Sequence, residues 1–311
     1  MPPNASSELT ARQSALGISL VTIGAATAQL GASFAALALP ALGIAAVVLV
    51  RQLVMAVIHV PLAHRSLRAA GTRDPLWGVA LAVPLMAMNA AIYAAIREMG
   101  VGLAVTVEFL GPLALSVLAT RSRLGLVCAL MGLVGMLCVT GPSGSATWLG
   151  TGFALLAASS WAAYLALSRA AGRRLTGLAP SAVAALTSVL VLTPIVLLTL
   201  DATRVTASAV GFAVAAGLLT SAVPYALDVI VLRILPLGLV SLLMSVHPAC
   251  AALAGALVLG ERLSPVDVAG LLLISGANVM AVRASLRRPA PGAAPAPADV
   301  EAAAEAPRAE H

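Results

Sequence analysis

The stretch MGVGLAVTVEFLGPLALSVLATR, residues 99–121, contains a single charged residue, Glu108, before the arginine that closes it. A helix of about 20 apolar residues is long enough to cross the hydrocarbon core of a bilayer. Residues 100–119 are therefore predicted to span a membrane. An acid in the middle of such a span costs about 2.5–3.5 kcal/mol on insertion scales, so it is expected to face a cavity or a partner.

The composition of the whole chain also predicts a membrane protein. Of the 311 residues, 60% are hydrophobic and 10% are charged, whereas a soluble globular protein carries roughly 25% charged residues. The net charge of +6 comes from arginines spread over the ends of apolar runs, not from one basic face, which argues against a nucleic-acid partner. The three cysteines, Cys128, Cys138 and Cys250, lie inside apolar runs without metal-ligand spacing, so they are interpreted as packing residues.

Breaks at charges, Pro and Gly divide the chain, outward from this stretch, into ten apolar spans. The spans are 14–37, 41–62, 75–96, 100–119, 122–140, 147–168, 178–200, 206–230, 237–259 and 264–284. We therefore predict an all-α, polytopic membrane protein with ten transmembrane helices.

The positions of the arginines agree with this count. One side of the membrane receives Arg12, Arg65, Arg68, Arg73, Arg121, Arg123, Arg169, Arg173, Arg174, Arg233, Arg283, Arg287 and Arg288. The alternate loops hold Arg97, Arg204 and Arg262. Because cytoplasmic loops carry the arginine excess, both termini are expected on the cytoplasmic side of the cell (inner) membrane.

The two halves of the chain share an order of elements. With Pro112 placed over Pro248, Arg97 falls on Arg233, and both segments continue through an apolar helix to an Arg-Leu pair. Five helices per half is an odd number, so the second copy enters the membrane from the opposite side, as in the inverted repeats of secondary transporters. The predicted parts are a cytoplasmic tail 1–13, a first repeat 14–141, a second repeat 147–284 and a disordered cytoplasmic tail 285–311.

The stretch 99–121 resembles the fourth helix of EamA-type members of the drug/metabolite transporter superfamily. It is most similar to the bacterial threonine/homoserine exporter group, through the Glu-Phe-x-Gly-Pro motif that begins at Glu108. The segment VPYALDVIVLRILPLGLVSLLMSVHPACAALAGALVLGERLSP, 223–265, looks like the eighth and ninth helices of that family. Relatives usually carry Glu where this chain has His247. The resemblance covers about 14–284 and implies an exporter.

Polar residues inside the spans are the candidates for binding substrate or coupling protons. Pro112 removes the amide that would bond the carbonyl of Glu108, which weakens the helix at the acid. Arg51, with Gln52 beside it, either binds a substrate carboxylate or pairs with Glu108. His247 precedes Pro248 and either relays protons or is a neutral, hydrogen-bonded histidine.

Further candidates lie on other spans. Asn89 and Tyr93 share one face of the third span, and Tyr225 and Asp228 share one face of the eighth. Asp228 could also pair with Arg233. Helix breaks are expected at Pro84, Pro224, Pro112 and Pro248. Weaker cavity candidates are Gln29, Trp161 and Tyr164, while Glu261 and Asp267 are expected to be solvated.

The sequence thus predicts a secondary exporter of small metabolites that works by proton antiport, with amino acids or related amphoteric compounds as the first expected substrates. An exporter of drugs or other organic cations, and a non-transport sensor or channel, stay open as alternatives. No nucleotide-binding motif and no hydrolase motif is present, so neither ATP nor an enzymatic activity is expected, and no metal or cofactor. The expected partners are a small-molecule substrate, protons and the lipid bilayer, with a homodimer left open.

Overall fold

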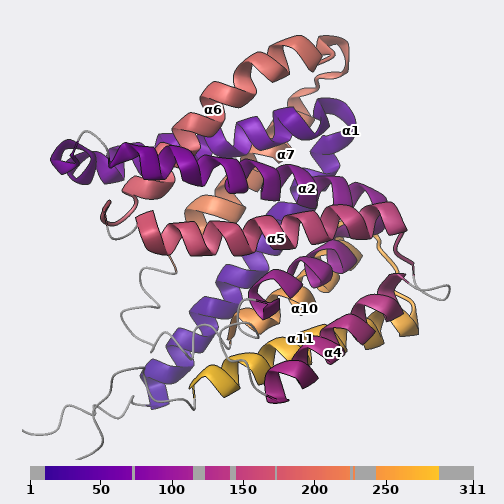
Figure 1. The fold of residues 1–311 in the computed structure, drawn as a ribbon. Coiled ribbons are helices and arrows are strands. Elements are labelled where there is room, and N and C mark those ends of the chain that lie inside the picture. The colour runs from indigo at the N-terminus through magenta and orange to yellow at the C-terminus, as the bar shows by residue number, and fades with distance from the viewer. Residues whose placement is uncertain are drawn as a thin grey trace, which may run out of the picture.

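The computed structural model describes residues 11–71, 74–114, 123–140, 145–171, 174–224, 227 and 243–286, and these residues contain helices and loops but no strand. The long helices are α1 (Ala11–Ala69), α2 (Pro75–Glu108), α4 (Arg123–Thr140), α5 (Trp148–Ala171), α6 (Ala179–Thr199) and α11 (Pro265–Leu286). The shorter ones are η1 (Ala202–Arg204), α7 (Ala207–Gly217), η2 (Leu218–Ala222), η3 (Met244–Val246), α10 (His247–Ala254) and η4 (Gly255–Leu259). Figure 1 shows them as one bundle.

Six helices in the described ranges are long and apolar enough to cross a membrane. Two of them are interrupted by a glycine with a left-handed backbone: α1 at Gly43, where φ is 70°, and α2 at Gly100, where φ is 82°. A straight α1 would be about 90 Å long at 1.5 Å per residue, three times the hydrocarbon core. Each interruption therefore divides its helix into two arms, and these arms correspond to the predicted spans 14–37 and 41–62, and 75–96 and 100–119.

The count of ten spans and the inverted order of the repeats stay predictions. Two shorter apolar helices, Ala207–Ser221 and Met244–Leu259, lie within the predicted spans 206–230 and 237–259. The connection between them, 228–242, lies outside the described residues, as do 1–10 and 287–311, which hold most of the predicted tails.

The surface of the bundle is apolar, as lipid requires. On α6, Leu190, Leu197 and Leu198 are 76%, 79% and 87% exposed. A contiguous apolar surface of this kind would drive aggregation in water. The multi-pass membrane protein expected from the composition is therefore the protein observed.

Glycines let the helices pack backbone to backbone. Helices α4 and α11 lie side by side (Figure 1), and a Cβ added at Gly135 would lie 2.8 Å from the carbonyl oxygen of Gly270. The reverse addition, at Gly270, would lie 2.6 Å from the carbonyl oxygen of Gly135. Likewise a Cβ at Gly111 would lie 2.2 Å from the carbonyl oxygen of Ala158 on α5. Such close approach is typical of membrane helices, which lack a hydrophobic drive to associate.

The helix breaks differ in part from those predicted at the prolines. Helix α2 continues through Pro84 and is interrupted at Gly100 instead, so the predicted break at Pro84 is wrong. A proline forfeits one hydrogen bond but keeps a helical φ, whereas Gly100 takes a φ outside the helical region. The same helix ends at Glu108, and helical backbone resumes at Leu110, so an interruption does lie beside the acid, as Pro112 predicts.

The other two prolines adjoin non-α turns. Pro248 lies in the first turn of α10, directly after the 3-10 turn η3. The amide of His247 donates to the carbonyl of Met244, so this carbonyl is occupied rather than free, in contrast to the expectation for a simple proline break. Pro224 follows the π-helical turn η2, and π turns are frequent at functional sites.

Glu261 and Asp267 are not solvated as the sequence suggested. The carboxylate of Glu261 accepts hydrogen bonds from the amides of Val101 and Gly102, at 2.7 and 3.2 Å. Asp267 is fully buried and accepts from the amide and hydroxyl of Ser145, at 3.0 and 2.5 Å. Both acids satisfy amides that helices and loops leave unpaired. Asp267 also accepts from the amide of Ser264, at 2.9 Å, whereas Val101, Gly102 and Ser145 are too far away in the sequence for a local pattern to indicate them.

Candidate substrate-binding site

A cavity of about 260 Å³ lies inside the bundle, between both arms of α1, α2, α5, the turn η2 and α10. Of the predicted site residues, those that line it are Arg51, Asn89, Tyr93, Glu108, His247 and Pro224. The weaker candidates Gln29, Trp161 and Tyr164 also line it. Tyr225 and Asp228 lie outside the described residues. Polar residues from spans far apart in the sequence therefore meet at one place.

Arg51 is held by the two candidates of the third predicted span. Its Nη1 donates hydrogen bonds to Oδ1 of Asn89 and, at 3.2 Å, to the hydroxyl of Tyr93. Asn89 is itself oriented by a 2.7 Å hydrogen bond from its amide nitrogen to the carbonyl of Leu85. A guanidinium has five N–H donors, so the group is fixed and still has donors for a ligand.

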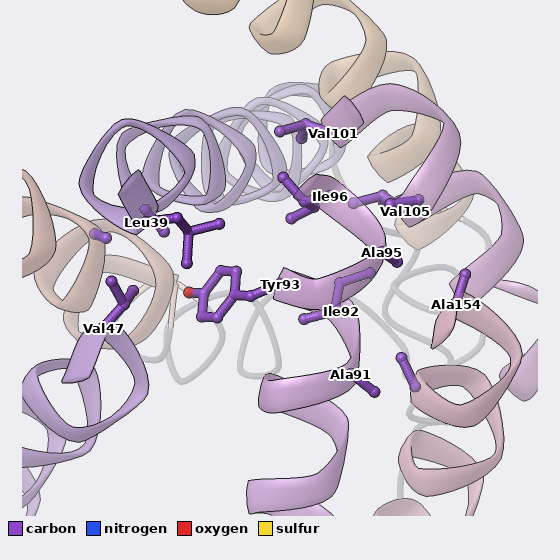
Figure 2. Close-up of a cluster of buried hydrophobic side chains, with 14 of the residues drawn as sticks. Leu39, Val47, Ala91, Ile92, Tyr93, Ala95, Ile96, Val101, Val105 and Ala154 are labelled. Atoms are coloured by element: carbon purple, nitrogen blue, oxygen red, sulfur yellow. The ribbon is translucent and has the colours of Figure 1, made fainter. Parts of the chain in front are cut away.

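The Tyr93 side chain is fixed by apolar packing. Figure 2 shows its ring between Ile92 of α2 and the α1 residues Leu39 and Val47, with the hydroxyl directed toward the α1 side. Tyr93 is almost fully buried. The hydroxyl that binds Arg51 is therefore placed by a rigid core rather than by a loop.

Glu108 lines the same cavity but does not pair with Arg51. In the part of the chain that the structure describes, the ion pairs are Arg97–Glu98 and Arg204–Asp201, both near helix ends. No described residue donates a hydrogen bond to the Glu108 carboxyl group. Glu108 is also the last residue of α2, where the helix dipole adds negative partial charge and attracts cations. The alternative of a structural Arg51–Glu108 pair is thus not what the chain forms.

His247 belongs to an aromatic wall beside the acid. Its Nδ1 lies 3.1 Å from Nε2 of Gln29, and its ring lies 5.6 Å from the ring of Phe109. Phe109 in turn meets Trp161 edge to face, with centroids 4.9 Å apart. The wall brings apolar surface and a titratable imidazole to the side of the cavity that carries Glu108.

Several lining residues were missed by sequence reasoning. Thr220 and Ser221 lie in the π-helical turn η2, and Phe109 lies at the end of α2. Hydroxyl residues in apolar spans are common, so their type alone carried no signal. The nearby Pro224 was the available indication, because irregular helix turns place side chains on a face that a regular helix would not.

A second cavity, of about 610 Å³, lies at the end of the bundle that is predicted to face outside. It is lined by Gly43, Arg97, Asp201 and Arg204 among others, and Ile96 lines both cavities. Hydrogen bonds from the side chain and amide of Thr203, opposed by slight desolvation and aided by Arg204, hold the pKa of Asp201 below its usual value. The charged residues of this larger cavity are exposed to solvent and need no ligand, so the cavity of about 260 Å³ is the better candidate for a binding site.

A bundle of membrane helices around a cavity with an arginine, a carboxylate and a histidine has the architecture of a membrane transporter. Residues 148–283 match the EamA-like transporter family. The chain is 32% identical over 273 residues to the threonine/homoserine exporter RhtA of Escherichia coli strain K12, covering 85% of this chain and 90% of that protein. The exporter of the same name from Salmonella typhimurium strain LT2 is 31% identical over 205 residues, 65% of this chain and 69% of its own length. The chain belongs to the EamA-like transporter family.

A solved crystal structure has a similar fold. Its TM-score to this chain is 0.56 at 21% sequence identity, and the match covers 86% of this chain and 99% of the other. At this identity the likeness concerns the fold alone.

Proposed function

We propose that this chain exports small amino acids across the cytoplasmic membrane in exchange for protons. The observation that carries the proposal is that Arg51 and Glu108 line one cavity without pairing with each other. A zwitterion presents a carboxylate and an ammonium group a few ångströms apart. The guanidinium suits the carboxylate, because its N–H groups bind two oxygens at once, and the Glu108 carboxylate suits the ammonium.

The names of the relatives supply the first substrates to test. The Escherichia coli and Salmonella relatives are called threonine/homoserine exporters. A cavity of about 260 Å³ suits amino acids of this size rather than large drugs. Threonine and homoserine are therefore the proposed substrates.

Coupling to protons is proposed from the titratable groups of the cavity. Glu108 cannot hold a proton and an ammonium group at once, so the two compete for the same carboxylate. His247, on the same side of the cavity, is a second group that can take up a proton. Competition of this kind converts a proton gradient into movement of the substrate in the opposite direction.

Alternating access requires two halves that rock around the cavity. We propose the inverted repeats 14–141 and 147–284 for this role, with both termini in the cytoplasm. The family match at 148–283 nearly coincides with the second repeat and supports the division.

One observation favours a different substrate class. The aromatic wall of Phe109 and Trp161 beside Glu108 would suit an organic cation, through cation–π attraction and charge. Arg51 in the same cavity opposes a ligand with positive charge alone. Organic cations are therefore the second candidate.

The proposal is tested with the purified full chain in lipid vesicles whose interior is more acidic than the medium. Protons that leave such vesicles should drive labelled threonine and homoserine inward against a concentration gradient, and a protonophore should abolish the accumulation. Protein-free vesicles are the control. Accumulation of a small membrane-impermeant organic cation such as tetraethylammonium, with no uptake of either amino acid, would establish the second candidate instead.

A further inference from the structure

Two buried hydrogen-bond acceptors of the cavity have no partner in the described protein. Gln52 is 1% exposed and Gln29 is 7% exposed, and both line the cavity. The side-chain carbonyl oxygen Oε1 of each lacks a hydrogen-bond donor among the residues that the structure describes. A buried acceptor left unpaired is destabilising, because it has lost its hydrogen bonds to water without gaining others. Two such atoms at one cavity point to a ligand that supplies the donors.

The two amides are held by burial and by a neighbour. Gln52 lies within helix α1 and is buried, so packing restricts its side chain. The amide nitrogen of Gln29 is engaged with His247, which leaves its oxygen as the group that can serve a ligand. Both oxygens are therefore features of an ordered site rather than of loose side chains.

We propose that Gln29 and Gln52 form a subsite that reads a hydroxyl group on the side chain of the substrate. This inference rests on the proposed function, in which Arg51 and Glu108 take the two charged ends of an amino acid. The ammonium group binds the carboxylate more strongly than a neutral amide, so the amide oxygens are left for a neutral donor. An O–H group is such a donor, and a methyl group of the same size is not.

The subsite makes the exporter discriminate between isosteres. Threonine and valine differ by a hydroxyl in place of a methyl group, and so do homoserine and norvaline. A site that hydrogen-bonds a hydroxyl rejects the analogue without it, because the acceptors are then buried and unpaired. We expect a preference of about tenfold or more for threonine over valine and for homoserine over norvaline.

The test is a competition experiment in vesicles that hold the full chain. Exchange of labelled threonine across the membrane is measured while unlabelled threonine, valine, homoserine or norvaline competes. Gln52→Leu and Gln29→Leu should each reduce the discrimination at least about fivefold, by weakening the hydroxylated competitor and sparing the aliphatic one. Asn278→Leu is the matched control, because Asn278 is a buried amide of α11 that does not line the cavity, and it should leave the discrimination unchanged.

The outcomes separate the subsite from the function it rests on. Equal competition by threonine and valine in the unsubstituted chain would overturn the subsite while leaving amino-acid export intact, as would full discrimination in both glutamine variants. Absence of any amino-acid exchange would overturn the proposed function and the subsite with it. If a leucine variant does not fold, Gln52→Met keeps the length of the side chain without its acceptor, and the comparison of isosteres in the unsubstituted chain decides independently.

Discussion

The carboxylate of Glu261, in the loop before α11, accepts a 2.7 Å hydrogen bond from the amide of Val101, 160 residues earlier in the chain. A second bond comes from Gly102, so Glu261 caps the arm of α2 that ends at Glu108. The space is tight, because a Cβ added at Gly100 would lie 2.7 Å from the Glu261 carboxyl group. The contact joins the predicted second repeat to the arm that carries the acid of the cavity.

Glu261→Gln should lower both stability and transport. The amide of glutamine can accept only through one oxygen, and its NH₂ group opposes the second backbone donor, which costs about 0.5–2 kcal/mol as for other lost caps. The measurement is the midpoint of thermal unfolding of the purified protein, together with the rate of threonine exchange. Glu98→Gln is the control. Glu98 is close to Gly100 in the sequence, but its ion pair is a long contact of 4.0 Å with the exposed Arg97, so its loss should cost little. Equal midpoints for the two variants would show that the cap does not stabilise the protein.

Asn89→Asp should weaken substrate binding without unfolding the protein. The new carboxylate would form an ion pair with Arg51 and compete with the carboxylate of the substrate, raising the KM for threonine by about tenfold, or 1.4 kcal/mol. Tyr93→Phe removes the 3.2 Å hydrogen bond to Arg51 but adds no charge, and should raise KM by only a few-fold. An unchanged KM in the Asn89→Asp variant would show that Arg51 does not bind the substrate.

Orientation in the membrane is tested with single cysteines in a chain whose own three cysteines are replaced by alanine. Thr147→Cys, Ser208→Cys and Arg174→Cys place a thiol at exposed loop or helix-end positions. With both termini in the cytoplasm, an impermeant thiol reagent should label the first two in intact cells and Arg174→Cys only after permeabilisation. The reverse pattern would invert the proposed topology.

The membrane class and the candidate cavity residues were predictable because membrane physics leaves a strong record in sequence. A helix that crosses the membrane needs about 20 consecutive apolar residues, and an ionisable residue within such a helix needs a cavity or a partner. Five predicted polar residues, together with Pro224, accordingly line one cavity. What the sequence could not provide was the partner of each group, because these contacts join distant segments.

Arg51 illustrates this limit. Its charge and Glu108 suggested a pair, yet hydrogen bonds to Asn89 and Tyr93 satisfy it instead. The additional break predicted at Pro84 does not form, and α2 is interrupted at Gly100, between the predicted spans 75–96 and 100–119, where the Glu261 carboxyl group lies against the backbone. Prolines and charged residues can be read from the sequence, whereas the long-range packing that decides which residue breaks a helix or pairs with a charge cannot.

Glu108 is the centre of the proposed mechanism, as the group for which the ammonium and the proton compete. Glu108→Gln keeps the size of the side chain and removes its charge. Arg51 forms no direct ion pair with Glu108 and keeps its hydrogen bonds to Asn89 and Tyr93, so the substitution breaks no direct contact of Arg51, and the variant should express and fold like the unsubstituted chain. Glu98→Gln, an acid outside the cavity, is the matched control.

The decisive measurement is the accumulation of labelled threonine by acid-interior vesicles that hold folded Glu108→Gln protein. We expect accumulation driven by the proton gradient to fall by about tenfold or more, the equivalent of 1.4 kcal/mol, while Glu98→Gln accumulates threonine normally. A folded Glu108→Gln variant that accumulates threonine as fast as the unsubstituted chain would contradict the role of Glu108 in both binding and coupling.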